Sequence, residues 1–182
     1  VACAGATTAV DRIQFENNAL SGTLPSELSN LNELRYLIIE EGQTGGSIPS
    51  ELGLLSGLIV LDLNFNVLQG TIPEEIYTGL HLLFQLDLND NLLTGTISPA
   101  VSNLSYLDFL QLENNNIDGT IPESLGSLIG LRVLELYNNN LISTMPDSVC
   151  QNVGRGLTKL TADCDASSSS RVYCPCCTAC PI

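Results

Sequence analysis

One pattern recurs through most of this chain and constrains its fold more than any other feature. Its consensus is LxxLxLxxNxLxGxIPxxLxxLxx, and the first apolar position of successive copies falls at Val10, Leu34, Leu58, Leu83, Leu107, Leu131 and Leu157. The copies are therefore 24, 24, 25, 24, 24 and 26 residues apart. A fixed period of this size predicts a solenoid, because each unit is too short to bury its own apolar side and must stack on its neighbours.

The repeat divides the chain into three parts. We expect a partial N-terminal cap over residues 1–9, a solenoid of about six to seven coils over residues 10–160, and a cysteine-rich C-terminal cap over residues 161–182. Hydrophobic residues make up 44% of the sequence and charged residues 14%, which favours a packed protein over a disordered one.

The copy at residues 107–130 shows what each unit is expected to form. The alternation of Leu107, Leu110 and Leu112 predicts a short strand whose inward leucines stack on those of neighbouring coils, so that the strands make a parallel sheet. Farther along, Gly119 and then Ile121-Pro122 end the strand pairing and start a helical or 3₁₀ turn. The predicted fold class is an α/β repeat solenoid with a concave parallel β-sheet and short helices on the convex side.

An asparagine follows the strand in most copies, and we call this row the asparagine ladder. Its side-chain amides can satisfy backbone groups that would otherwise be buried without partners, so a structural role is favoured over a catalytic one. Gly42 takes the same place in the second copy, where we expect a looser coil. The ladder consists of Asn18, Asn66, Asn91, Asn115 and Asn139.

Together these motifs resemble the plant-type leucine-rich repeat, with its LxGxIP signature, of receptor ectodomains and secreted polygalacturonase-inhibitor-like proteins. The resemblance covers about residues 10–160. It implies a right-handed, twisted superhelix with a concave parallel sheet and a short second sheet near the LxGxIP segment. The usual activity of that family is recognition, so the resemblance implies a protein or peptide partner, no catalysis and no cofactor.

Composition excludes several classes of partner. Twenty acidic and six basic side chains give a net charge of -14, so there is no basic stripe for nucleic acid. The longest apolar stretch, Leu52–Leu63, is broken by two glycines and a carboxylate, and we expect no direct membrane insertion. The chain opens at Val1 without a signal peptide, and we interpret it as a mature product that is secreted or held at the cell surface or wall.

Six of the seven cysteines gather near the C-terminus, which favours an oxidising compartment and three disulfides. Six cysteines allow fifteen pairings, and the sequence does not choose among them, although the vicinal Cys176 and Cys177 should bond to different partners. A metal–thiolate cluster is the alternative for this CxCCxxC segment. The tail resembles that of secreted leucine-rich-repeat proteins of diatom-like algae. The cysteines are Cys150, Cys164, Cys174, Cys176, Cys177 and Cys180.

Two further residues carry expectations of their own. In the family that the repeat resembles, the N-terminal cap carries a pair of cysteines, and Cys3 matches the second of them. We therefore expect the disulfide partner of Cys3 to lie outside this chain, the alternative being a free, small apolar residue. The sequon Asn103-Leu104-Ser105 makes Asn103 a candidate glycosylation site.

The repeat also fixes which strand residues point outward on the concave sheet. They form three lanes across the strands, the first just before the central leucine, the second between the paired leucines and the third just past them. Aromatic side chains beside carboxylates favour a binding face for a basic or amphipathic protein or peptide, whereas the alternative is a merely solvated sheet. The candidate partner-binding residues are Tyr36, Ile38, Glu40, Val60, Asp62, Phe65, Asp87, Asn89, Phe109, Gln111, Glu113, Val133, Glu135 and Tyr137.

Three other functions were weighed against recognition. Asp62 and Asp87 would hold Ca²⁺ on neighbouring strands, but solvated carboxylates are commoner than ion sites, so no metal is assigned. Repeats that assemble side by side would make a structural subunit of an extracellular matrix, wall or filament. An enzyme such as a glycosidase is least favoured, because a shallow sheet lacks an enclosed pocket and the sole histidine, His81, has no motif-spaced acid or nucleophile.

Overall fold

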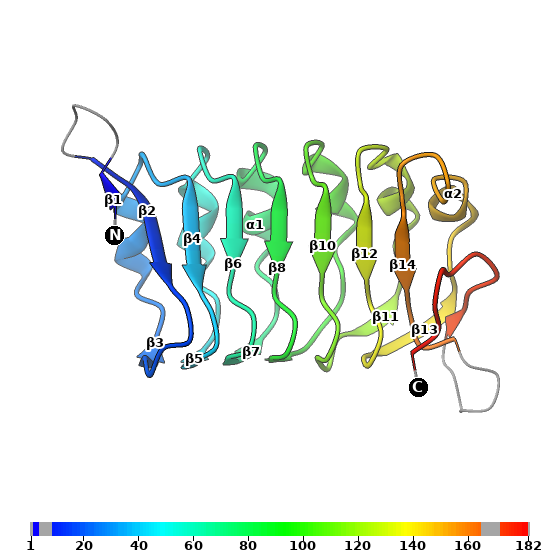
Figure 1. Cartoon of the computed structure of the whole chain (residues 1–182), viewed down its shortest axis with the longest axis horizontal. Helices are drawn as coiled ribbons and strands as arrows, with labels where there is room; N and C mark the ends of the chain where they lie inside the picture. Colours follow the sequence, from blue (N-terminus) through cyan, green and yellow to red (C-terminus); the bar gives the residue numbers. More distant parts are fainter. Residues whose placement is uncertain (1, 4–8, 165–171, 182) are drawn as a thin grey trace.

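The computed structural model describes residues 2–3, 9–164 and 172–181, which form a single solenoid (Figure 1). The predicted fold class is confirmed. The main sheet has eight strands, and apart from β1 all of them run parallel in chain order, one from each coil. They are β1 (Ala2–Cys3), β2 (Val10–Phe15), β4 (Tyr36–Ile39), β6 (Val60–Asp62), β8 (Gln85–Asp87), β10 (Phe109–Gln111), β12 (Val133–Glu135) and β14 (Lys159–Thr161).

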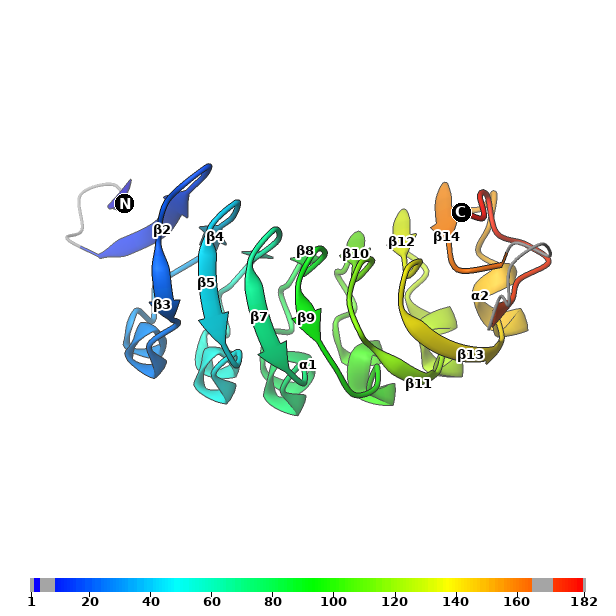
Figure 2. The same cartoon turned by 90° about the horizontal axis from the view of Figure 1, so that it is seen from below.

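After the turn that follows the main sheet, the chain adds strands to one of two shorter sheets. Short helices form the convex side (Figure 2). One short sheet contains β3 (Ser21–Thr23), β5 (Gln43–Gly46), β7 (Val67–Gly70) and β9 (Leu92–Leu93), and the other contains β11 (Asp118–Thr120), β13 (Asn140–Thr144) and β15 (Val172–Tyr173). The helices are η1 (Ser26–Asn30), η2 (Ser50–Leu54), α1 (Glu74–Gly79), η3 (Pro99–Asn103), η4 (Glu123–Ser127) and α2 (Asp147–Cys150).

The core lies between the main sheet and the convex helices. The inward strand residues Leu61, Leu86 and Leu110 are each 0% exposed, and Ile76 of α1 closes the core from the other side, also at 0%. Full burial of one such side chain stabilises the fold by about 1.5–3 kcal/mol, so stacked copies hold together what a single coil could not. Within the described residues, no helix is long and apolar enough to cross a membrane.

The glycine of the repeat is required where the second sheet turns toward the convex helix. Gly95 adopts a φ of 77°, and a Cβ there would lie 2.6 Å from Cγ2 of Thr71 in the preceding coil. A side chain is therefore excluded by backbone conformation and by contact with the preceding coil. The following proline, for example Pro73 before α1, is extended and ends the strand pairing.

The asparagine ladder joins each coil to the one before it. Asn91 is 6% exposed; its Oδ1 accepts from the Leu68 N–H at 2.9 Å, and its Nδ2 donates to the Leu63 carbonyl at 2.9 Å. Nδ2 also lies 3.2 Å from the Leu88 carbonyl of its own coil. One side chain thus satisfies buried backbone groups of two coils, and Asn66, Asn115 and Asn139 repeat the arrangement.

Asn18 departs from this arrangement because Gly42 leaves the next ladder position without a side chain. Its Nδ2 donates forward to the Glu40 carbonyl at 2.7 Å, and its Oδ1 accepts from the Leu20 N–H at 2.8 Å. A Cβ on Gly42 would lie 2.8 Å from Asn18 Oδ1. The Asn18 side chain therefore lies close to the place that a side chain at Gly42 would need. Strands β4 and β5 of this coil still pair with strands on both sides.

The N-terminal edge of the main sheet differs from the all-parallel expectation, because β1 pairs antiparallel with β2. A strand laid across an edge in this way covers backbone groups that would otherwise pair with another chain. Cys3 belongs to β1, but its side chain and residues 4–8 lie outside the described part of the chain, so the expected partner of Cys3 stays a prediction.

Two disulfides fasten the C-terminal tail to α2 and to the end of β14, and a third lies within the tail itself. The vicinal cysteines have different partners, as expected. The Thr178 N–H donates to the Leu160 carbonyl of β14 at 2.8 Å, so the tail covers that edge of the sheet. Strand β14 reaches Thr161, one residue past the predicted end of the solenoid. The pairs are Cys150–Cys176, Cys164–Cys180 and Cys174–Cys177.

Candidate binding face

The strand register aligns the outward residues of the concave sheet into the three lanes. Neighbours in the first lane pair directly, in the order Arg12, Tyr36, Val60, Gln85, Phe109, Val133 and Lys159. The second lane pairs in the order Gln14, Ile38, Asp62, Asp87, Gln111, Glu135 and Thr161. The third lane lies just past the strands and contains Glu40, Asn64, Asn89, Glu113 and Tyr137.

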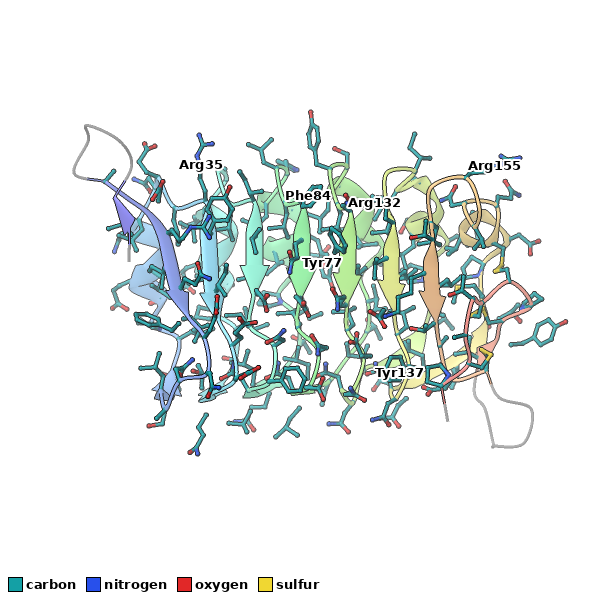
Figure 3. The ribbon with its side chains drawn as sticks, in the orientation of Figure 1. Arg35, Tyr77, Phe84, Arg132, Tyr137 and Arg155 are labelled. Carbon is teal, nitrogen blue, oxygen red and sulfur yellow. A yellow bond between two sulfur atoms is a disulfide. The ribbon has the colours of Figure 1, made fainter. Side chains whose placement is uncertain are left out.

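The first lane carries the aromatic side chains of the face. The Arg12 guanidinium lies 3.8 Å from the ring centroid of Tyr36. Phe109 has its ring 5.6 Å from that of Phe84 in an edge-to-face arrangement and 5.1 Å from the Arg132 guanidinium. Figure 3 shows Phe84 and Arg132 near the upper edge of the sheet, where they precede β8 and β12 on the two coils that flank the coil of Phe109. These contacts hold half-buried rings in place, which is the arrangement of aromatic anchors at protein interfaces.

Four carboxylates of the second and third lanes are buried, which the sequence did not lead us to expect, whereas Glu40 is partly exposed. The exposed fraction is 8% for Asp62, 5% for Asp87, 5% for Glu113 and 5% for Glu135. Parallel strands lie about 4.8 Å apart, so each carboxylate is covered by side chains of the coils on either side. An outward position on this tightly stacked concave sheet is therefore not a solvated one.

Burial changes the acidity of these groups. Desolvation, followed by the nearby charges of Asp62 and Glu113, raises the pKa of Asp87 to about 8. Desolvation is also the main cause that raises the pKa of Glu113 to about 7, with further contributions from Glu135 and Asp90. The pKa of Asp62 is raised by desolvation as well. The centre of the face thus holds carboxyl groups that carry protons near neutral pH.

Four polar atoms at this centre have no hydrogen-bond partner among the described residues. We call Asp62, Asn64, Asp87, Asn89 and Glu113 the acidic shelf. Among the described residues, Asp87 Oδ1, Asn89 Oδ1, Asn64 Oδ1 and Glu113 Oε2 are buried without a hydrogen-bond donor. Leaving such groups unpaired costs about 1–3 kcal/mol each, so the shelf is held in place by the stacking around it.

Basic residues are kept away from the shelf. Lys159, in the last strand, pairs with Glu135 at 2.8 Å, and Arg132 pairs with Asp108. Figure 3 places Arg35, Arg132 and Arg155 along the upper edge of the sheet. Neither salt bridge of the described residues therefore involves Asp62, Asp87 or Glu113.

A row of left-handed backbone conformations borders the face and was missed by the sequence reasoning. Asparagine and aspartate tolerate this conformation, and the recurring Asn-Asn pairs were the available signal. Phe65 is the bulky exception, with a φ of 49° and a side chain 50% exposed in the turn after β6. It therefore lies beside the third lane, at the border of the face. The row consists of Asn17, Glu41, Phe65, Asp90, Asn114 and Asn138.

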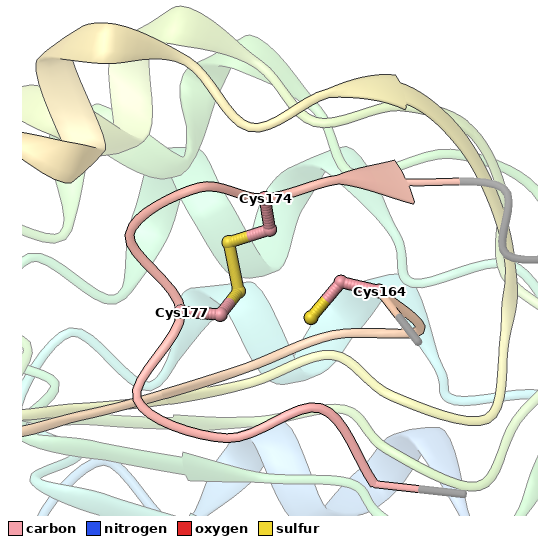
Figure 4. A group of neighbouring side chains, drawn as sticks. All are labelled: Cys164, Cys174 and Cys177. Carbon is pink, nitrogen blue, oxygen red and sulfur yellow. A yellow bond between two sulfur atoms is a disulfide. The ribbon is translucent and has the colours of Figure 1, made fainter. Parts of the chain in front are cut away.

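The remaining candidate residues lie elsewhere. Asn103 is exposed at the end of η3 on the convex side, so its glycosylation stays a prediction. In the described residues, the group of three metal-ligating side chains close enough to share an ion is Cys164, Cys174 and Cys177 (Figure 4). All three are in disulfides, which makes them poor ligands, because a metal requires the thiolate.

Comparison with known proteins extends this description. Solved structures that it resembles include a plant peptide hormone receptor, RGFR1, in complex with RGF2, with 36% identity and a TM-score of 0.77. That match covers 80% of this chain but 23% of the receptor, so the chain spans about a quarter of its length. The BIR3–SERK2 complex from Arabidopsis thaliana matches with 33% identity and a TM-score of 0.68, over 76% of this chain and 72% of that one.

A third similar structure is a plant ice-binding protein, with 28% identity and a TM-score of 0.79 over 88% of this chain and 51% of that one. Comparison with curated protein sequences gives no match. The family described as Leucine Rich Repeat matches residues 57–78, 82–104, 106–128 and 130–152. These matches cover half of the sequence and coincide with the coils seen in the structure. The chain belongs to the leucine-rich-repeat family.

Proposed function

We propose that this chain is an extracellular, non-catalytic recognition module that binds a basic or amphipathic protein or peptide along its concave face. The observation that carries the proposal is the pairing of aromatic anchors with carboxyl groups that form no salt bridge within the described residues. Tyr36 and Phe109 offer apolar area in the first lane, and Asp62, Asp87 and Glu113 offer acidic groups beside it, which a basic partner would ionise. Aromatic anchors supply binding energy, while the charges orient the partner and select its sign.

Two further findings support this proposal. The similar structures include a receptor bound to a peptide hormone, and partner binding is the established role there. Three disulfides in the C-terminal cap fit an oxidising compartment outside the cytosol.

Affinity capture tests the proposal. The immobilised chain would be incubated with secreted proteins of its source organism, and the bound proteins identified by mass spectrometry. We expect the double variant Tyr36→Ala, Phe109→Ala to lose the partner at least about tenfold while thermal stability changes by only a few degrees. The control Leu54→Ala changes an apolar side chain that is 70% exposed on the convex side, and it should bind normally. Equal binding by all three proteins would contradict the proposal.

The same material tests assembly as a structural subunit. Light scattering after size-exclusion chromatography should give a monomer for a recognition module. Concentration-dependent oligomers that persist in the double variant would instead favour a matrix or filament role.

A second candidate function is the binding of ice, and it rests on a different side of the coil. One exposed hydroxyl side chain stands at the same repeat position in each of six coils, just before the buried residue that precedes the proline. A parallel stack repeats these hydroxyl groups about every 4.8 Å, which is the kind of regular, uncharged array that an ordered water lattice can match. The row consists of Thr23, Ser47, Thr71, Thr96, Thr120 and Thr144.

Inhibition of ice recrystallisation tests this second candidate. Thr71→Lys would interrupt the hydroxyl row in the middle, and we expect it to abolish any inhibition. Thr78→Lys introduces the same side chain at an exposed site at the end of α1 and should leave inhibition unchanged. No inhibition by the unaltered chain would rule the candidate out.

A further inference from the structure

The acidic shelf contains buried hydrogen-bond acceptors that the fold does not use. Asp87, Asn89 and Glu113 are 5%, 6% and 5% exposed. Each has one oxygen that meets no donor among the described residues, namely Asp87 Oδ1, Asn89 Oδ1 and Glu113 Oε2. Native proteins pair nearly all such groups, so unpaired acceptors that gather on one face indicate a place where an external donor enters.

Asn89 points to a ligand independently of the acidic residues, because it is a neutral amide. It lies two residues past Asp87, so its side chain is on the same face of the sheet. Its Nδ2 is already occupied, since it donates to Asp90 Oδ2 at 2.7 Å. Only the acceptor Oδ1 is left over. Once Asp87 and Glu113 are ionised, the unpaired atoms of the shelf are therefore all acceptors, and they require a ligand that only donates.

The spacing of these acceptors argues against a single metal ion. Calcium needs six to eight oxygen atoms at about 2.3–2.6 Å. In the described part of the chain, no three carboxylates of the shelf bring their oxygen atoms within 4.8 Å of one another. The acceptors come instead from two successive coils about 4.8 Å apart, with Asp87 and Asn89 in one coil and Glu113 in the next. A planar guanidinium with five N–H donors can reach acceptors spread over neighbouring strands, whereas a compact ammonium cannot fork in this way.

We propose that the acidic shelf is the subsite for an arginine side chain of the partner, with the guanidinium held between Asp87, Asn89 and Glu113. This inference rests on the proposed recognition function and names the chemistry at its centre. The acceptors are covered by neighbouring lane residues. Entry of the guanidinium therefore requires the Asp87 or Asn89 side chain to change rotamer. The first-lane rings of Tyr36 and Phe109 would then pack against the rest of the partner.

Proton release accompanies this binding. The groups that face Asp87 are Asp62 from β6, Glu113 past β10 and Glu40 past β4, all of them acidic. Glu113 faces Glu135 and Asp90, and Lys159 is the nearby cation. The pKa of Asp87 is about 8 and that of Glu113 about 7, so both hold protons at neutral pH. A bound guanidinium favours the ionised forms, and about one proton should leave per ligand near pH 7.

Calorimetry with defined peptides tests the inference. Acetylated hexa-arginine amide and hexa-lysine amide would be titrated into the whole chain at about 0.15 M salt, where loose attraction is screened. Two buffers with different ionisation enthalpies report the proton release. The shelf variant is Asp87→Asn, which keeps the shape of the side chain. Its matched control is Asp118→Asn, which removes an equal charge at an exposed position on β11.

The expected result is tighter binding of hexa-arginine than of hexa-lysine, with release of about one proton. Asp87→Asn should weaken hexa-arginine at least about tenfold, and Asp118→Asn should change it less than about twofold. Equal effects of the two variants, or equal affinity for both peptides, would overturn the arginine subsite. Calcium binding at millimolar concentration that Asp87→Asn abolishes would overturn it in favour of a metal site.

Failure of the subsite is distinguishable from failure of the proposed function. If hexa-arginine binding depends on Tyr36 and Phe109 but not on Asp87, the concave face binds and the shelf does not. If binding depends on none of these residues, the concave face itself is excluded.

Discussion

The asparagine ladder and the acidic shelf are both rows of buried polar side chains that cross the same coils, yet their hydrogen bonding is opposite. Asn91 is 6% exposed and every polar atom of its side chain is bonded to backbone. Asp87 is 5% exposed, and its Oδ1 has no donor among the described residues. Equal burial therefore has opposite consequences for stability.

The difference shows how a repeat separates folding from recognition. The ladder uses its whole hydrogen-bonding capacity to tie coils together, so it has none to offer a partner. The shelf keeps unpaired capacity at an energetic cost, and the stacked leucines behind it provide the stability that offsets this cost. Residues retained at such a cost are candidates for function.

The largest expected effect comes from removing a ladder side chain. Asn91→Ala should lower the free energy of unfolding by about 3 kcal/mol, because the Leu68 N–H and the Leu63 carbonyl would be left buried without partners. Urea denaturation measures the change. Asn116→Ala is the control, since Asn116 is exposed, and it should cost less than about 0.5 kcal/mol. If the two variants lose similar stability, a ladder asparagine stabilises the fold no more than an exposed asparagine does.

The contribution of the acidic shelf to stability should fall as the pH rises. The raised pKa of Asp87, about 8 against an ordinary 3.8, means that the folded chain keeps a proton that the unfolded chain releases. The stability that this proton contributes is present at about pH 4 and is lost as the pH rises through about 8. Asp87→Asn cannot ionise, so it should be clearly more stable than the unaltered chain at pH 9 and about equal to it at pH 4.

Thermal denaturation over this pH range measures the difference, and Asp118→Asn serves as the exposed control. A loss of stability in Asp87→Asn at high pH would mean that the carboxylate has a partner in the fold and that the shelf resembles the ladder after all.

A smaller effect is expected at the gap in the ladder. Gly42→Asn should lower stability by about 1 kcal/mol, because the new Cβ would lie 2.8 Å from Asn18 Oδ1. Combining it with Asn18→Ala removes the obstacle and lets the new amide take the ladder contacts. A double-mutant cycle should therefore show favourable coupling of about 1 kcal/mol. Stabilisation by Gly42→Asn alone would show that Asn18 does not replace the missing ladder residue.

The smallest effect is expected at Phe65, which lies in the sequence between Asn64 of the acidic shelf and Asn66 of the asparagine ladder. Phe65→Asn places a residue suited to the left-handed backbone at a φ of 49°, so stability should rise by about 0.5–1 kcal/mol. If the exposed ring serves the partner, binding should weaken in the same variant. Asn114→Asp provides the comparison, because Asn114 has the same left-handed backbone conformation and both residues tolerate it. Its stability should change by less than about 0.5 kcal/mol.

Much of this architecture was predictable because the repeat acts locally. Leu61 and Leu86 could be assigned to the core from spacing alone, and the lanes followed from the alternation of strand residues. Burial of Asp87 was not predictable, because it is created by neighbours from coils about 24 residues away on either side. The reversed bonds of Asn18 follow from the absence of a side chain at Gly42, and that dependence appears only when the coils are stacked.

The disulfides show a second limit. Six cysteines can pair in fifteen ways. The pairs that form depend on where α2 and β14 place their cysteines in space, and the spacing of cysteines along the sequence does not encode this. Cys150 lies in α2 and therefore meets Cys176 of the tail, while Cys164 follows β14 and meets Cys180.

The two covered edges of the main sheet have a consequence for association between molecules. The antiparallel β1 occupies one edge, and Thr178 and Ala179 of the tail bond to β14 at the other. A second molecule cannot continue the parallel stack as an additional coil at either place, which blocks fibres that grow end to end. Copies that associate must meet flank to flank, with the concave surface left free for a different molecule.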